Sequence, residues 1–273
     1  MTELQAVVLG LVQGLTEFLP VSSSGHLTLV KELFGVNADN LSFEVVVHAA
    51  TVLSTIVAFR KDIADLLKGF FKFEYNSQMQ YILKIGVSMI PIFIVGVFFK
   101  DVVTEIFGAG LLIVGCMLVV TALLLTLAEF LSIRQLSRKV SSGTPKEVGY
   151  KEAFVMGLAQ SVAVLPGLSR SGTTIATGLM LGVDKKSVAK FSFLMVLVPI
   201  LGEAFLELVS GEMSVASSGI STSALLLGFV SAFVSGYLAC RWMIAIVQKA
   251  KLRYFSIYCL CAAILCFVLN YLS

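Results

Sequence analysis

Long apolar stretches dominate this sequence and leave it few ways to fold. Six of them are long enough to cross a membrane as helices, near residues 43–59, 82–99, 109–132, 190–210, 221–248 and 254–272. A hydrocarbon core of about 30 Å needs a helix of roughly this length. Only 14% of the 273 residues are charged and 58% are hydrophobic, which is too little charge to cover a water-soluble protein of this size. We therefore expect an all-α integral membrane protein and exclude a cytosolic enzyme, a nucleic-acid-binding protein and a disordered chain.

Two further apolar stretches are interrupted by polar residues. The first covers 4–34 and breaks at Pro20 and at 22–26, where the sequence is Ser-Ser-Ser-Gly-His. The second covers 150–182 and breaks at 166–172. Backbone groups freed at such breaks cannot face lipid, because nothing there would pair with them. We predict that each stretch is a re-entrant helical hairpin, which enters and leaves the membrane on one side.

The Lys and Arg residues predict the orientation of the chain. They gather in the connections 60–80, 133–149, 183–190 and 249–253, whereas 211–220 has none. Cytoplasmic loops of membrane proteins are enriched in Lys and Arg. If both hairpins return to their own side, all four basic connections face the cytoplasm, and both termini lie outside.

The two interrupted stretches also match one another at an offset of 147 residues. The matched pairs include Gly10 with Gly157, Gln13 with Gln160, Ser22 with Ser169, Ser24 with Ser171, and Gly25 with Gly172. We expect a single membrane domain over 1–273, built from one unit of about residues 1–135 and a second of about 148–273. Each unit is one hairpin followed by three spans, so the second unit is inverted relative to the first. Such a plan places the functional site where the broken elements meet.

Ionisable and nucleophilic groups gather at these two breaks. Glu17, Ser23 and His26 offer a base, a hydroxyl nucleophile and a second proton carrier, and Arg170 offers a guanidinium suited to phosphate oxygens. Both serine-rich breaks also resemble helix N-termini, which bind anions. Because ionisable groups are costly inside a membrane, these residues are functional candidates.

Simpler interpretations stay open at this point. The serines could be ordinary helix caps, and Glu17 with Arg170 could be a structural ion pair. His26 could be a hydrogen-bonded interior residue. Glu44 and His48 lie four residues apart on one helix face, where a structural hydrogen bond is a better explanation than a metal pair.

The two motifs identify a family. Residues 13–27 (QGLTEFLPVSSSGHL) and 166–174 (PGLSRSGTT) resemble the two signatures of the undecaprenyl-diphosphate phosphatases, also called bacitracin-resistance proteins, and the similarity covers essentially the whole chain. The resemblance implies a bacterial inner-membrane hydrolase that converts undecaprenyl diphosphate to undecaprenyl phosphate and inorganic phosphate, and so recycles the lipid carrier for peptidoglycan synthesis. It also implies a polyprenyl diphosphate substrate, a site on the outer side, and a divalent cation, Mg²⁺ or Ca²⁺. It is compatible with a homodimer.

The resemblance also assigns roles by position. Ser23 matches the nucleophile, Glu17 an acidic residue for acid–base or metal work, His26 an essential histidine, and Arg170 the phosphate-binding arginine. We expect the remaining substrate contacts from Ser22, Ser24, Ser169, Ser171, Thr174 and Gln13. Position 13 is Gln where many family members have Glu, so Glu17 would carry the acidic role alone.

Two questions stay open from the sequence. The first is whether Ser23 or His26 attacks phosphorus. The second is whether the protein is instead a lipid-phosphate transporter or flippase that uses the same phosphate site, because inverted repeats with broken helices are typical of transporters. The serine cluster beside Glu17 favours chemistry, since carriage alone needs no nucleophile.

Overall fold

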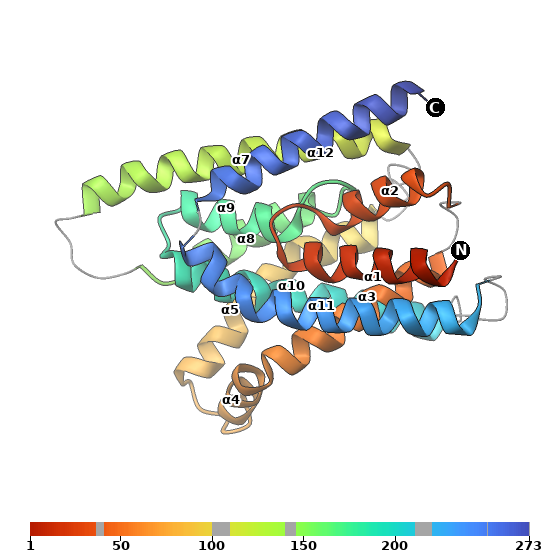
Figure 1. Cartoon of the computed structure of the whole chain (residues 1–273). Coiled ribbons are helices and arrows are strands. Elements are labelled where there is room, and N and C mark those ends of the chain that lie inside the picture. Colours follow the sequence, from red (N-terminus) through yellow and green to blue (C-terminus); the bar gives the residue numbers. More distant parts are fainter. Residues whose placement is uncertain (37–40, 100–109, 140–145, 211–219, 250, 273) are drawn as a thin grey trace.

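The computed structural model describes residues 1–36, 41–99, 110–139, 146–210, 220–249 and 251–272. Within these ranges every regular element is an α-helix (Figure 1). The helices are α1 (Glu3–Phe18), α2 (Ser23–Leu33), α3 (Leu41–Ala58), α4 (Arg60–Phe70), α5 (Ser77–Phe98), α7 (Gly110–Lys139), α8 (Tyr150–Val162), α9 (Arg170–Met180), α10 (Lys185–Ser210), α11 (Thr222–Lys249) and α12 (Leu252–Leu272). The all-α prediction is confirmed for this part of the chain, while parts of the connections 133–149, 211–220 and 249–253 lie outside the described residues.

Several helices are long and apolar enough to cross a membrane. Among the described residues four qualify by length and composition, α5, α7, α11 and α12. The number rises to five if α3 and α4, which meet at an angle of 71°, form one bent span. A chain with this many such helices is a multi-pass membrane protein. The predicted stretch 190–210 lies within α10, which is not among these helices, so a total of six spans stays a prediction.

Helix breaks lie where the two interrupted stretches predicted them. α1 ends at Phe18, because Pro20 has no N–H to continue the helix and keeps Leu19 extended, with ψ of 145°. α2 starts after its N-cap Ser22, and α9 starts after its N-cap Ser169. Each interrupted stretch is therefore a pair of short helices, α1 with α2 and α8 with α9, and the members of each pair contact one another.

The two helix pairs pack against the rest of the molecule in matching ways. α1 packs along α11, and α8 packs along α5. Glycines make both approaches close: a Cβ on Gly10 would lie 2.4 Å from the Gly228 carbonyl oxygen, and one on Gly157 would lie 2.3 Å from the Ser88 carbonyl oxygen. Small residues allow such approaches between membrane helices. Gly10 and Gly157 are a matched pair of the two interrupted stretches, and each lies at a close contact between helices.

Several elements that carry lysines lie toward one end of the molecule. Figure 1 shows both termini at one end, whereas α4, the start of α8 and the turns α9–α10 and α11–α12 lie toward the other. Elements at this second end contain Lys68, Lys151 and Lys185. An ion pair of 2.5 Å between Lys190 Nζ and Asp62 Oδ1 joins α10 to α4. The basic connections that the structure describes therefore share one end of the molecule.

Candidate active site

The two helix breaks lie against one another at the centre of the molecule. Ser24 Oγ of the first break accepts a hydrogen bond of 3.5 Å from the Gly167 N–H of the second. Ser171 Oγ of the second break donates one of 3.3 Å to the Leu19 carbonyl of the first. The predicted meeting of the two breaks is confirmed by these contacts.

Glu17 is the residue on which this site converges. Its Oε2 accepts hydrogen bonds from Ser23 Oγ at 2.6 Å and from Gln13 Nε2 at 2.9 Å. Its Oε1 lies 3.6 Å from Arg170 Nη2, and only 5% of its side chain is exposed. A buried carboxylate is stable only with such partners. The arrangement places the Ser23 hydroxyl beside a base, as an activated serine nucleophile requires, and a fixed cation beside that base.

His26 is held away from this carboxylate. Its Nδ1 lies 2.7 Å from the Ser22 carbonyl oxygen, and its Nε2 lies 2.8 Å from the Tyr258 hydroxyl on α12. Within the described residues these are the hydrogen-bond partners of the ring, and neither Glu17 nor Ser23 is among them. The interpretation of His26 as a hydrogen-bonded interior residue therefore agrees with the structure. Ser23 contacts the Glu17 carboxylate, whereas the described partners of the His26 ring are Ser22 and Tyr258.

Two of the predicted substrate-binding serines are helix caps. Ser22 Oγ accepts from the Gly25 N–H at 3.3 Å, and Ser169 Oγ accepts from the Gly172 N–H at 3.0 Å. The backbone N–H of Ser169 in turn donates to Thr121 Oγ1 on α7. These serines thus form the two helix N-termini, and their hydroxyls already have partners.

The other predicted hydroxyls, those of Ser24, Ser171 and Thr174, make different contacts. Ser24 Oγ and Ser171 Oγ each lie 3.4 Å from the capping hydroxyl two residues before them, and they bridge the two breaks. Thr174 is fully buried, and its hydroxyl donates to the carbonyls of Arg170 and Ser171 in its own helix. A direct contact of Thr174 with substrate stays a prediction.

Gln13 is a further buried polar side chain beside Glu17. Its side chain is fully buried and its Nε2 donates to Glu17, but its Oε1 has no partner among the described residues. No group of three His, Cys, Asp or Glu side chains within the described ranges could hold a metal ion. Mg²⁺ is often bound through one or two protein oxygens and substrate phosphates. The Glu17 carboxylate is a ligand of this kind, and Gln13 Oε1 is a second oxygen without a partner among the described residues.

Glu44 and His48 do not form the metal pair that their spacing left open. His48 Nδ1 bonds to the backbone oxygen of Glu44 at 2.8 Å, and the Glu44 carboxylate pairs with Lys31. Lys31 is almost fully buried, which its place at the end of an interrupted stretch did not indicate.

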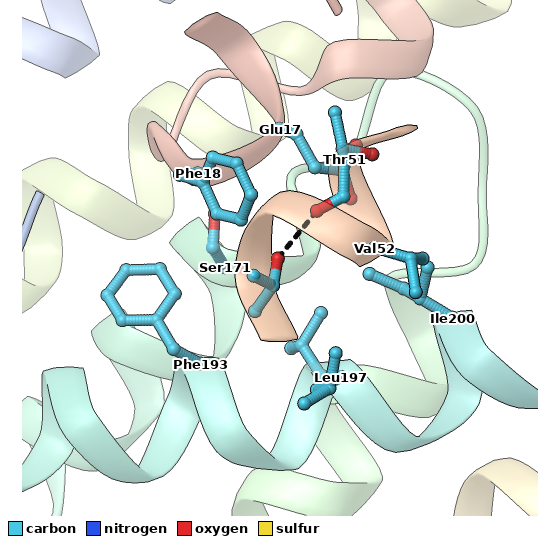
Figure 2. A pocket seen from close by; sticks show the side chains of 10 residues that line it. Glu17, Phe18, Thr51, Val52, Ser171, Phe193, Leu197 and Ile200 are labelled. Atoms are coloured by element: carbon cyan, nitrogen blue, oxygen red, sulfur yellow. Dashed lines mark hydrogen bonds between the residues drawn. The ribbon is translucent and has the colours of Figure 1, made fainter. Parts of the chain in front are cut away.

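A pocket opens beside Glu17 between α3 and α10. Glu17 and Ser171 line it together with Thr51 and Thr55 of α3, as Figure 2 shows in part. Its remaining walls are apolar: Phe18, Val52, Phe193, Val196, Leu197 and Ile200. The pocket has a polar end at the carboxylate and apolar walls, and its volume of about 20 Å³ has room for about one water molecule.

Tyr258 is one of the contributors to this region that sequence reasoning missed. It lies 232 residues from His26 in the chain and inside an apolar helix without a motif. A tyrosine in a membrane span has an apolar ring and one polar atom, so its position alone predicts no partner.

Comparison with known proteins finds similarity over almost the whole length of the chain. The family model described as bacitracin resistance protein BacA matches residues 6–265. An undecaprenyl-diphosphatase of Bacteroides fragilis is 54% identical, with 98% of each chain covered. Proteins of the same name from Christiangramia forsetii and Methanobrevibacter smithii are 46% and 37% identical, with at least 96% of each chain covered.

Proposed function

The chain belongs to the bacitracin resistance protein BacA family, and on this premise we propose how its site hydrolyses undecaprenyl diphosphate. The enzyme is an undecaprenyl-diphosphatase: it releases inorganic phosphate and returns undecaprenyl phosphate, the lipid carrier of cell-wall synthesis. One observation carries the mechanism, the 2.6 Å hydrogen bond from Ser23 Oγ to Glu17. A carrier that only moves lipid needs no hydroxyl beside a buried base, so this contact favours hydrolysis over transport.

Ser23 is the nucleophile in this mechanism. Its Oγ forms a bond to the terminal phosphorus while its proton passes to Glu17, and the bond from that phosphorus to the bridging oxygen breaks. Undecaprenyl phosphate leaves, and Glu17 releases the proton to water. A water molecule then attacks the phosphoserine, and Glu17 transfers a proton from this water to Ser23 Oγ as inorganic phosphate departs. His26 is the weaker candidate, because Tyr258 and Ser22 occupy both of its ring nitrogens.

Positive charge at the two breaks stabilises the phosphates. Arg170 is 22% exposed beside a nearly buried Glu17, and it stands at the N-terminus of α9. The N-termini of α2 and α9 add partial positive charge at the two breaks. Such charge stabilisation supplies most of the catalysis in phosphoryl transfer. We expect Glu17 and Gln13 Oε1 to hold a divalent cation, Mg²⁺ or Ca²⁺, which when bound would neutralise further phosphate charge.

We propose that the first isoprenyl units of the lipid widen the small pocket between α3 and α10 as they enter it. Glu17 and Ser171 stand at its polar side, where the diphosphate reacts, and Val52, Val196 and Ile200 form its apolar wall. A prenyl chain in this position leaves the site sideways between two helices, so only the head group needs to reach the helix breaks.

The proposed topology has six spans and two re-entrant hairpins in an inverted repeat, within a bacterial inner membrane. Both termini and the active site face the outer side, and the basic end faces the cytoplasm. The common end of the termini in Figure 1 and the matched packing of α1 on α11 and α8 on α5 support this proposal. A homodimer stays a prediction.

Phosphate release from the purified protein tests the proposed function. Undecaprenyl diphosphate is supplied in detergent, and a vesicle assay with a labelled lipid follows its movement between leaflets. The hydrolase account expects phosphate release that disappears in Ser23→Ala. Lipid movement without phosphate release would favour the transporter instead.

A further inference from the structure

Tyr258 makes a contact that the hydrolysis mechanism does not use. Its hydroxyl lies 2.8 Å from His26 Nε2, and the two rings are nearly parallel, with an interplanar angle of 4°. The contact joins α12, at the end of the chain, to the first turn of α2. It lies outside both sequence motifs.

The other ring nitrogen fixes the protonation pattern of His26. The Ser22 carbonyl oxygen, 2.7 Å from Nδ1, can only accept a hydrogen bond, so Nδ1 carries a hydrogen. In the neutral ring Nε2 is then the acceptor, and the Tyr258 hydroxyl donates to it. The Ser22 carbonyl therefore fixes the tautomer of His26, and Tyr258 helps to fix the direction in which the ring points.

His26 in turn holds a strained turn. Ser22 has φ of 71°, in the left-handed region that a serine rarely adopts. Its carbonyl oxygen accepts two hydrogen bonds from His26, one from the backbone N–H at 3.2 Å and one from Nδ1. A conformation of this kind persists only where its surroundings hold it in place. The next residue is Ser23, whose Oγ must point at Glu17 for attack.

We propose that Tyr258 is a positioning residue for phosphate hydrolysis. Its hydroxyl orients His26, His26 holds the Ser22 carbonyl, and the held turn directs Ser23 Oγ toward Glu17. The inference rests on the proposed function, because it assigns Tyr258 a part in the same reaction. It also gives His26 a role at Nδ1, in place of attack through Nε2.

Removal of the hydroxyl alone tests the proposal. Tyr258→Phe keeps the ring and its packing, so the protein should remain folded. We expect kcat for phosphate release to fall about tenfold, which is the effect of losing one hydrogen bond of ordinary strength, while KM is unchanged. The matched control is Tyr254→Phe on the same helix, whose ring lies beside Arg253, and it should keep full activity.

A double-mutant cycle separates positioning from a merely structural role. If Tyr258 acts through His26, Tyr258→Phe has no further effect in a His26→Ala background. A second variant, His26→Asn, places an amide N–H where Nδ1 stood and leaves nothing for Tyr258 to bind. It should retain more activity than His26→Ala and be insensitive to Tyr258→Phe.

Three results would overturn the inference. They are full kcat in Tyr258→Phe, an undiminished effect of Tyr258→Phe in the His26→Ala background, and a rise in KM with kcat unchanged. Phosphate release by the wild-type enzyme distinguishes a failure of this inference from a failure of the proposed function. If it releases phosphate while Tyr258→Phe matches it, only the role of Tyr258 is wrong. If it releases none, the proposed function itself fails.

Discussion

Ser23 Oγ donates a hydrogen bond of 2.6 Å to Glu17 Oε2 across the break that separates α1 from α2. The two residues are six positions apart, and the extended Leu19 together with Pro20 turns the chain back between them. A continuous helix would place residues six positions apart on different faces. The break therefore creates the pairing of base and hydroxyl on which the mechanism depends.

Replacement of the base should stop the reaction with little effect on binding. Glu17→Gln keeps the size of the side chain and removes the group that takes the Ser23 proton. General-base catalysis is worth roughly 100- to 10,000-fold, so kcat should fall by at least about 100-fold with a small change in KM. Steady-state phosphate release measures this effect. Glu32→Gln, on an exposed part of α2, is the control and should behave as wild type.

Loss of the Arg170 guanidinium should lower kcat/KM about as much as loss of an oxyanion-hole donor lowers the rate of other enzymes. We expect Arg170→Ala to lower kcat/KM by about 100- to 1,000-fold, or roughly 2.7–4 kcal/mol of transition-state stabilisation. Arg170→Lys should recover part of this loss, because a charge remains without the planar fork. Near-normal hydrolysis by Arg170→Ala would show that Arg170 and Glu17 form only a structural pair. Arg241→Lys, on an exposed part of α11, serves as the control.

The cation requirement should depend on position 13. Chelation of divalent ions should abolish hydrolysis, and addition of Mg²⁺ or Ca²⁺ should restore it. Gln13→Glu replaces an amide oxygen that has no partner among the described residues with a second carboxylate. Half-maximal activity should therefore need less Mg²⁺. A titration of Mg²⁺ against phosphate release measures the shift. Equal activity with and without chelator would exclude a catalytic cation.

A change in the pocket between α3 and α10 should affect substrates with a prenyl tail more than substrates without one. Val196 lines this pocket, and Val196→Trp would fill it with a larger side chain. The KM for the full-length lipid diphosphate should therefore rise. A diphosphate without a prenyl chain should be hydrolysed as by the wild type. Val198 lies two residues further along α10 with 44% exposure, and Val198→Trp should leave both substrates unaffected. A similar KM for both Trp variants would place the tail elsewhere.

Close helix contacts should make certain glycines irreplaceable. A Cβ on Gly14 would lie 2.6 Å from the Ala232 carbonyl oxygen, whereas one on Gly86 would meet nothing within 4 Å. We expect Gly14→Ala to lower the stability by about 1–3 kcal/mol through overpacking. Gly86→Ala should be neutral or slightly stabilising, because alanine is the better helix former. Thermal unfolding in detergent compares the two variants.

Much of this architecture could be predicted from local sequence. Pro20, the serine clusters and the glycines act on their own turn or on the nearest helix, so the breaks and their matched spacing could be located along the chain. The meeting of the breaks followed from the repeat, and the Ser24–Gly167 and Ser171–Leu19 contacts confirm it.

What could not be predicted depends on distant partners. Nothing around Tyr258 in the sequence indicates His26, because the pairing is made by the packing of the last helix against the second. Nothing near Lys31 in the sequence indicates its partner Glu44 either. The choice between the interpretations of His26 depends on packing in the same way, since residue type alone gives its chemistry and its neighbours decide how that chemistry is used.

The most direct test of the central claim is to trap the covalent intermediate. The purified enzyme is mixed with lipid diphosphate labelled on the terminal phosphate, quenched within one turnover and digested for mass spectrometry. The account predicts label on the peptide that contains Ser23, as an acid-stable phosphoserine, and none in Ser23→Ala. An acid-labile label on His26, or full activity in Ser23→Ala, would contradict it.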